Sequence, residues 1–360
     1  MLKSYDFKVR IDGTVYTHTS SMRFNRSMDM LGGGLKLDLI DPDRSLIRAF
    51  RPGIRSEIEI NGVTITKAIF DLVSINDNNG HVYSYTGRDP SGDLVDCSAM
   101  FSDGGFSKKN INLETAIKDL LKPYGMGVKM AADGGAAFNE VSFTPGETVA
   151  EVIRRLCKYR ALFPFSDGFG NLVITKAGAR RSGGYLATGD EGNVITRNGD
   201  ISHIQRYSEI IVKGGSNGGA GLEGFSEASP DDLASKEGRA RDPDITRHRP
   251  LIIQAESEGY DLDLQERALW EVRHRRFSGV SLNYTVPGWE AAEGEFWKIN
   301  TLVPVIDAPL FIKRDMLVKS VELSRDDQGT TTTLGVAPAE AYDLPPSREP
   351  ESDDALWGGA

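Results

Sequence analysis

The stretch that decides the fold occurs twice in this chain. Its first copy is Arg51–Asp89, RPGIRSEIEINGVTITKAIFDLVSINDNNGHVYSYTGRD, and its second is Glu295–Pro338, EFWKINTLVPVIDAPLFIKRDMLVKSVELSRDDQGTTTTLGVAP. Each copy opens with a predicted strand that ends in an Ile-Asn pair, Ile60-Asn61 or Ile299-Asn300. Because duplicated modules are typical of rings, shells and scaffolds, the repeat indicates an assembly component and not a lone active site.

Each copy then continues through a β-rich run and a polar tip with glycine into a return strand. The return strands alternate polar and apolar residues with the period of two of a half-buried strand. The three elements of the two copies are, in order, Phe70–Ile75 and Met316–Leu323, Asp77–Gly80 and Arg325–Gly329, and His81–Thr86 and Thr330–Val336. We therefore predict two related antiparallel β modules.

Composition places the chain among globular proteins of two to three domains. It has 360 residues, 39% of them hydrophobic and 26% charged, and a net charge of −10. The acidic balance argues against stable binding to nucleic acid. No apolar stretch is long enough to span a bilayer and no signal peptide is apparent, so we predict synthesis in a bacterial cytoplasm without membrane insertion. Cys97 and Cys157 lie far apart and form no metal motif.

The fold class that we predict is α+β, mainly β, with two related antiparallel barrel-like domains and a small α/β domain between them. The first barrel-like domain covers residues 1–90 and begins with a hairpin, Phe7–Ile11 and Val15–Ser20, around Asp12-Gly13. A strand pair near Ser21–Asn25 and Gly34–Leu39 follows, so the strands suffice to close or nearly close a small barrel.

The small α/β domain is predicted over residues 91–185. Asn112 is a good N-cap for a helix over Leu113–Leu121, and a second helix should start near Thr144 and run to about Tyr159. A hairpin, Leu162–Phe165 and Asn171–Thr175, completes it.

The second barrel-like domain is predicted over residues 186–343, before an acidic, Pro-rich tail at 344–360. Its predicted elements are strands at Ile201–Gln205, Ser208–Val212 and Val280–Val286, a long mobile loop at about 214–250, and a helix at about 264–277.

No pattern of catalytic, cofactor-binding or metal-ligating residues is present. The five histidines have no partner at ligand spacing, and the sequence lacks HExxH, CxxC, GxSxG and the Walker loop. The glycine-rich run Gly214–Gly224 reads as a loop because it has no lysine for a phosphate. Acidic pairs such as Asp41/Asp43 and Asp261/Asp263 are better explained as caps of backbone amides. We therefore predict a protein that is not an enzyme and uses no cofactor.

Five residues are candidates for contacts with a neighbouring subunit or another partner. Four are arginines of one predicted helix, which could touch phosphate but in an acidic chain should pair with acidic loops or a neighbouring subunit. Trp357 in the acidic tail has no local core and could anchor a partner. The arginines are Arg267, Arg273, Arg275 and Arg276.

The chain resembles the baseplate hub family of Mu-like phage tail proteins. The resemblance is carried by Trp270 in the arginine-rich helix, the Val286–Trp289 turn and Gly329-Thr330, and in the N-terminal half by Tyr83–Asp89 and Phe143–Glu147. It implies a virion component of a contractile tail, active or prophage-derived. It also implies a homotrimer, in which two barrel-like domains per chain form a pseudo-sixfold ring. The implied ring joins the tail tube to the membrane-piercing spike and other baseplate proteins and lets DNA pass during ejection.

The alternative is a peptidoglycan-binding or cell-wall-degrading tail module, because the unit Thr144–Thr175 faintly resembles small peptidoglycan-binding domains. A lytic enzyme would need a pair of acidic residues in a cleft, and the sequence places no such pair. A spike protein is a third reading, but the chain lacks a long repetitive C-terminal β-helix.

Overall fold

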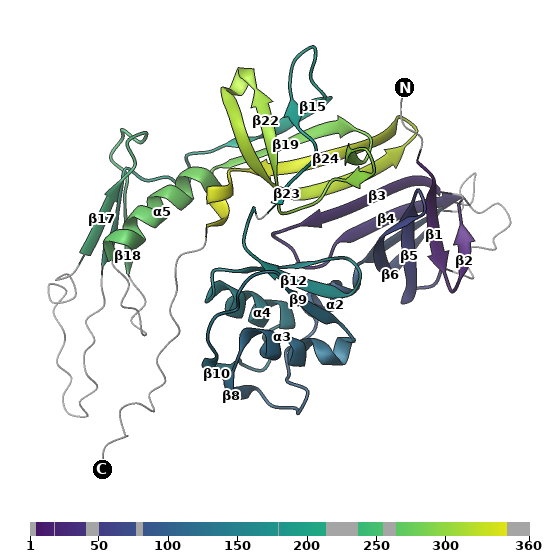
Figure 1. The fold of residues 1–360 in the computed structure, drawn as a ribbon, viewed down its shortest axis with the longest axis horizontal. Helices are drawn as coiled ribbons and strands as arrows, with labels where there is room; N and C mark the ends of the chain where they lie inside the picture. The colour runs from purple at the N-terminus through teal and green to yellow at the C-terminus, as the bar shows by residue number, and fades with distance from the viewer. Residues whose placement is uncertain are drawn as a thin grey trace. The chain divides into compact units, whose positions relative to one another are not determined.

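The computed structural model describes residues 5–17, 19–40, 50–76, 82–178, 180–213, 237–254 and 264–343. The chain divides into two compact units (Figure 1). The first unit consists of Met1–Cys157, Leu162–Asn198 and Leu282–Val336, and the second of Lys158–Ala161, Gly199–Ser281 and Ala337–Ala360. The domain boundaries expected at residues 90, 185 and 343 stay a prediction.

A fourteen-stranded, largely antiparallel sheet forms the main framework. Along its main path the order is β15-β19-β24-β23-β3-β4-β7-β6-β5-β1-β2, and β22 pairs with β23 as a branch. The strands of this path are β15 (Thr196–Ile201), β19 (Val280–Pro287), β24 (Gly329–Ala337), β23 (Ile312–Asp326), β3 (Thr19–Ser27), β4 (Gly34–Ile40), β7 (Val82–Arg88), β6 (Val63–Asn76), β5 (Ile54–Ile60), β1 (Phe7–Ile11) and β2 (Thr14–Tyr16). The short strands β13 (Arg180–Arg181) and β14 (Leu186–Ala187) pair in parallel with β22 (Thr301–Asp307).

The sheet order itself repeats. The run β15-β19-β24-β23 recurs as β3-β4-β7-β6, and β22 lies beside β23 as β5 lies beside β6. Matching hydrogen bonds align the copies, since Gly53 N donates to Phe70 O at 2.7 Å and Asn300 N donates to Val318 O at 2.8 Å. The prediction that the second copy opens with a strand ending at Ile299-Asn300 was therefore wrong. In the second copy the strand equivalent to β5 is β22, which begins after this pair. The described part of the second copy before β22 contains only the short strand β21 (Glu295–Phe296), which pairs with β20 (Glu290–Ala292).

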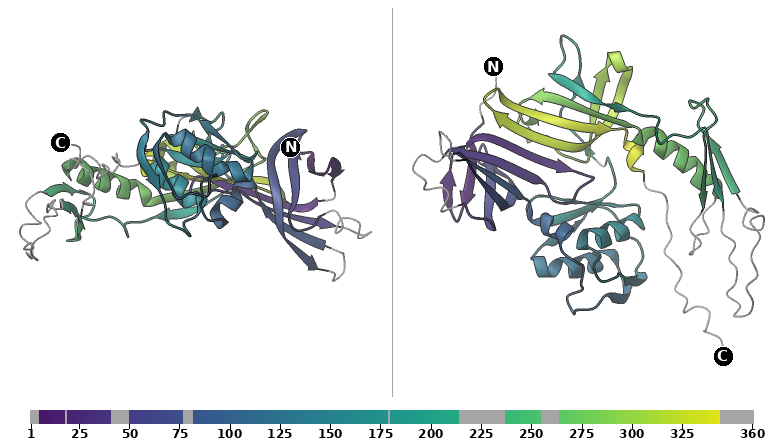
Figure 2. Two further views of the ribbon diagram at one scale, coloured as in Figure 1. Left: turned by 90° about the horizontal axis from the view of Figure 1, so that it is seen from below. Right: turned by 180° about the vertical axis from the view of Figure 1, so that it is seen from behind.

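The two modules meet where β3 pairs with β23 (Figure 2). β23 has fifteen residues, and it carries β22 along its first part and β3 along its second. We call the β3–β23 pairing, from Ser320↔Ser27 to Arg325↔Met22, the joint. The mainly antiparallel β fold is confirmed, but among the described strands neither module closes into a barrel.

One face of each module is apolar and the other is polar, as period-two strands dictate. The inward face of the first module is built from large side chains such as Phe24, Leu37, Phe70 and Tyr85, all buried. The opposite face carries hydroxyls, amides and a few charges that satisfy one another across strands. Across the two modules such pairs include Ser21 and Ser84 with Asp38, Thr285 with Thr333, Asn283 with Asn198, and Arg23 with Glu322.

A small α/β segment follows β7. It contains η1 (Pro90–Gly92), α2 (Asp93–Asp96), β8 (Ser107–Ile111), α3 (Leu113–Leu121), η2 (Lys122–Tyr124), β9 (Gly127–Met130), β10 (Phe138–Ser142), α4 (Val149–Lys158), β11 (Phe163–Ser166) and β12 (Asn171–Thr175). Asn112 caps α3 as expected, because its side chain accepts from Thr115 N at 2.8 Å. α4 begins later than Thr144, since Thr148 and Glu151 form a reciprocal capping box.

The turn before β12 fastens this segment to the first module. Gly168 O accepts from Lys67 N at 2.7 Å and from the Thr66 hydroxyl at 3.1 Å. The buried guanidinium of Arg26 donates to Ile65 O at 3.1 Å and lies where any side chain at position 168 would stand. Burial lowers the pKa of Arg26, although Asp89 and Asp167 partly offset that effect. Only glycine fits at this turn.

The second unit is a three-stranded sheet covered by one helix. Its elements are β16 (Glu209–Lys213), β17 (Glu237–Arg241), β18 (Pro250–Gln254), α5 (Leu264–Ser278) and η5 (Ala339–Tyr342). Ile210, Val212, Ala240 and Ala268 form its core. The helix predicted at 264–277 and the strands predicted at 208–212 and 280–286 are confirmed.

Two predictions for this part of the chain were wrong. Only Ile201 of the strand expected at Ile201–Gln205 is extended, because Arg206 N bonds back to His203 O in a turn. The loop expected at 214–250 contains β17, whose Gly238 and Ala240 are buried. Residues 214–236 of that loop lie outside the described residues.

Candidate functional site

The first candidate assembly surface is the distal half of β6, Asp71–Asn76. β5 pairs with β6 only as far as Phe70, while β7 accompanies the strand to Asn76. On the β5 side, the described part of the chain supplies no strand beyond Phe70. In this stretch Leu72 is 55% exposed and Ile75 is 61% exposed.

The equivalent stretch of β23 shows what a partner strand does there. Val321 and Leu323 are only 5% and 3% exposed, because β3 lies alongside. The distal half of β6 is thus equivalent to the part of β23 that pairs with β3, but no described strand pairs with it on that side.

The second candidate surface is the edge strand β15. It is paired with β19 on one side, has no described neighbour on the other, and all six of its residues are exposed. Ile195 precedes it and Ile201 ends it, at 57% and 56% exposed. An edge of unpaired amides flanked by aliphatic side chains is a template for another strand.

A buried carboxylate holds β15 in place. Asp307, whose side chain is fully buried at the end of β22, accepts from the Tyr284 hydroxyl at 2.9 Å and from the Arg197 guanidinium. Burial would raise the pKa of Asp307, but the hydrogen bonds from Arg197 and Tyr284 outweigh it and hold the pKa below its ordinary value. Burial and the same hydrogen bond raise the pKa of the Tyr284 hydroxyl. The edge strand β15 is therefore held to the sheet by a charged hydrogen-bonded cluster and not by a row of buried apolar side chains.

The four arginines expected at a subunit contact lie on α5, and each is near a carboxylate of the same chain. Arg267 and Arg275 both bond Glu271, which is buried on that helix. Arg276 approaches Asp244 at 3.0 Å, and Arg273 approaches Asp343 at 3.8 Å.

The ring of Trp270 adds to this arrangement. It stacks on His274, receives the Arg267 guanidinium on its face and donates to Asp343 O at 3.1 Å. These contacts hold α5 and η5 together. A role of the arginines between subunits stays a prediction, and Trp357 lies outside the described residues.

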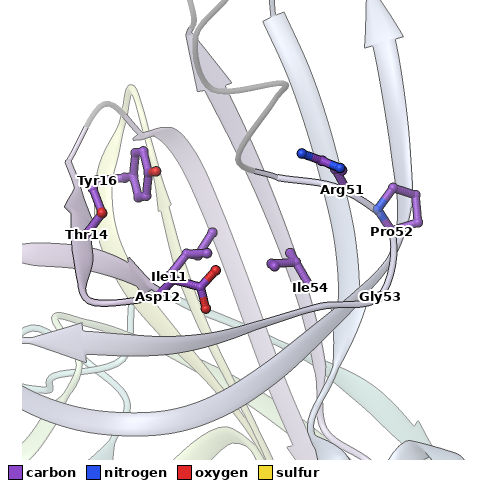
Figure 3. Close-up of a pocket in the computed structure, with 8 residues that line it drawn as sticks. All are labelled: Ile11, Asp12, Thr14, Tyr16, Arg51, Pro52, Gly53 and Ile54. Atoms are coloured by element: carbon purple, nitrogen blue, oxygen red, sulfur yellow. The ribbon is translucent and has the colours of Figure 1, made fainter.

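A hollow lies at the far end of the first module. Figure 3 shows it between the β1–β2 turn and the segment that leads into β5, with Tyr16 and Thr14 on one side and Arg51 and Pro52 on the other. It is an open hollow of ≈ 500 Å³. Among the described residues no group of three His, Cys, Asp or Glu side chains could hold a metal ion. No helix of the described chain is long and apolar enough to cross a membrane.

Sequence reasoning found the repeat but missed both open edges. A usable signal was the sequence of β15, Thr-Arg-Asn-Gly-Asp-Ile, which has no apolar alternation and so cannot be an ordinary half-buried strand. The open half of β6 left no comparable signal, because strand length does not reveal which neighbour is absent.

Comparisons with known proteins agree with this architecture. A family model described as the second domain of baseplate hub protein gp44-like matches residues 91–176, and one described as the fourth domain of the Mu phage baseplate assembly protein GpP matches residues 262–345. The chain is 31% identical over 343 residues to the baseplate hub protein gp44 of Escherichia phage Mu, covering 94% of this chain and 89% of that protein.

Solved structures show the same likeness. The 43 kDa tail protein of prophage MuSo2 from Shewanella oneidensis is 30% identical, with a TM-score of 0.79, 94% of this chain covered and 99% of that one. The c3393 protein of E. coli, a type VI secretion component with structural similarity to T4 tail proteins gp27 and gp5, shares the fold at 10% identity. Its TM-score is 0.53, with 92% of this chain covered and 76% of that one. The resemblance seen in the sequence is confirmed, and the chain belongs to the family of Mu-like phage baseplate hub proteins.

Proposed function

We propose that three copies of this chain close a ring that joins the tail tube to the central spike of a contractile tail and lets DNA pass. The observation that carries the proposal is the repeated strand order with one joint inside each chain. A chain with two equivalent modules and one joint has a free module edge at each end, so identical chains can add head to tail.

Closure of the ring makes three the expected number of chains. A head-to-tail contact forms either a closed ring or an open filament, depending on the rotation at each contact. Six equivalent modules in the ring correspond to three chains, which agrees with the pseudo-sixfold ring that the resemblance implies. Membership of the hub family supports the flanking partners that we propose, the tail tube and the spike.

The test is the mass of the purified protein in solution. Light scattering after size exclusion should give three times the 39.4 kDa of one chain at micromolar concentration. A stable monomer in both low and moderate salt would contradict the ring. A zymogram on peptidoglycan tests the cell-wall alternative on the same sample, and clearing of the substrate would contradict a purely structural role.

A further inference from the structure

We propose that β15 of one copy pairs antiparallel with the distal half of β6, Asp71–Asn76, of the next copy, so that the joint inside each chain is repeated between chains. The inference rests on the proposed function, because it specifies how the ring closes. In the closed ring every β23-type strand would have a β3-type neighbour, either from its own chain or from the next one.

The first step is the equivalence of β6 and β23. The bonds Gly53–Phe70 and Asn300–Val318 place Phe70 at the position of Val318. Counting on by the same offset, Val73 corresponds to Val321 and Ile75 to Leu323. The two stretches differ mainly in exposure. The side chains of β23 are covered by β3, whereas Ile75 is 61% exposed.

The second step is the equivalence of β15 and β3. β3 ends in Ser27 and β15 is followed directly by Ser202, and the two serines make the same local turn. The Ser27 hydroxyl accepts from Asp29 N at 3.1 Å, and the Ser202 hydroxyl accepts from Ile204 N at 3.1 Å. Both strands also occupy the same place in the repeated order, β3 next to β4 and β15 next to β19. Ser202 therefore corresponds to Ser27.

The third step transfers the register of the joint. Ser27 lies opposite Ser320, and Arg26 lies opposite Val321. The same pairing between chains sets Ser202 opposite Leu72 and Ile201 opposite Val73, and it places Gly199 opposite Ile75. Ile201, which is 56% exposed, would then pack against the half-buried Val73, which gives a partner to an aliphatic side chain that one subunit alone leaves in water.

The fourth step concerns the backbone amides. Ser202 N donates to Gly279 O at 2.8 Å, toward β19. Because successive amides of a strand point to opposite sides, Ile201 N points to the open edge. The joint uses its amides in the same way, since Met28 N donates to Lys319 O at 2.8 Å and the pair Arg26–Val321 lies two residues further along.

The pairing cannot form within one chain. Six strands separate β15 from β6 in the sheet, and at roughly 4.8 Å per strand the two edges are on the order of 30 Å apart along it. The occupant of each edge is therefore a second copy of this chain.

A disulfide tests the register directly. In the joint, Asn25 and Glu322 form a pair between two hydrogen-bonded pairs, where side chains approach most closely. The corresponding residues between chains are Asp200 and Ser74. Full-length protein carrying Ser74→Cys and Asp200→Cys, with Cys97→Ser to remove the exposed native thiol, should oxidise to a covalent trimer on a non-reducing gel.

The matched control moves one cysteine along the same face of β15. Ser74→Cys with Asn198→Cys, in the same background, places the sulfurs on a diagonal whose Cα atoms lie beyond disulfide reach. We expect at least tenfold less covalent trimer from this control. Light scattering is run on each sample before oxidation. A trimer mass without a register-specific cross-link overturns the strand pairing and leaves the ring standing, whereas a monomer mass overturns both.

A second variant removes a backbone hydrogen bond of the proposed pairing in addition to the side-chain contact of Ile201. Ile201→Pro deletes the amide that faces the open edge, and proline is tolerated on an edge strand where its nitrogen needs no partner. We expect the dissociation constant of the trimer to rise at least tenfold, with the melting temperature of the monomer unchanged and a smaller effect for Ile201→Ala. A trimer as stable as that of the wild type would overturn the pairing.

Discussion

Tyr284→Phe removes one oxygen atom from the cluster that anchors β15. The Tyr284 hydroxyl is buried and donates to Asp307 at 2.9 Å, and the Phe variant leaves the ring and the packing in place. A buried hydrogen bond to a charged group stabilises by about 1.5–3 kcal/mol, so we expect the free energy of unfolding at pH 7 to fall by about 2 kcal/mol. The assay is urea unfolding followed by circular dichroism, with a lower midpoint at unchanged slope.

The pH dependence of this loss separates the anchor from ordinary packing. The pKa of Asp307 is held below its ordinary value in the folded chain, so its contribution is present above about pH 4 and is lost as the pH falls through the folded pKa. The difference between wild type and Tyr284→Phe should therefore shrink below about pH 4. Thr285→Val, which disrupts a neutral hydroxyl pair with Thr333, should cost less and show no such trend. Equal midpoints at pH 7, or a difference that persists unchanged at low pH, would refute this account.

Three further outcomes are expected. Asp242→Asn breaks the buried two-pronged pair with Arg206 and should destabilise the second unit by roughly 3 kcal/mol, seen as faster hydrogen exchange in β16; unchanged exchange would contradict it. Removing residues 344–360, Trp357 included, should leave the melting temperature and the trimer mass unchanged, and loss of the trimer would place the tail in the core assembly. Because the chain has a net charge of −10, a titration with duplex DNA at low salt should give a dissociation constant above the micromolar range. Tighter binding would contradict free passage of DNA.

The repeat could be predicted from the sequence because hydrophobic alternation is a local property. The β-rich runs Phe70–Ile75 and Met316–Leu323 lie in β6 and β23, the two strands that occupy equivalent places in the repeated order. The alignment of the two copies could not be predicted correctly. The Ile-Asn pairs look alike, and Asn61 and Asn300 share the left-handed backbone conformation. Asn61 nevertheless follows β5, whereas Asn300 precedes β22, and only hydrogen bonds across the sheet reveal this difference.

The candidate surfaces could not be predicted from the sequence for the same reason, because they are defined by strand pairing between distant segments. The apolar residues Ile195 and Ile201 bound a polar strand, and nothing local shows whether such residues face a core or a neighbour. The arginines of α5 were found because charge is visible in sequence. Their shared partner Glu271 was not, since four-residue spacing on a helix allows several ion pairs.

The joint between β3 and β23 also fixes an angle. Folding of one chain sets the rotation between two neighbouring modules before any other copy is met. If every contact in the ring repeats that rotation, three of its six angles are determined by covalently continuous sheets, and assembly must reproduce only the other three. Each chain would then act as a gauge of curvature for the whole ring, so that substitutions within the joint, such as at Arg23 or Glu322, would alter the diameter of the ring or turn it into an open spiral.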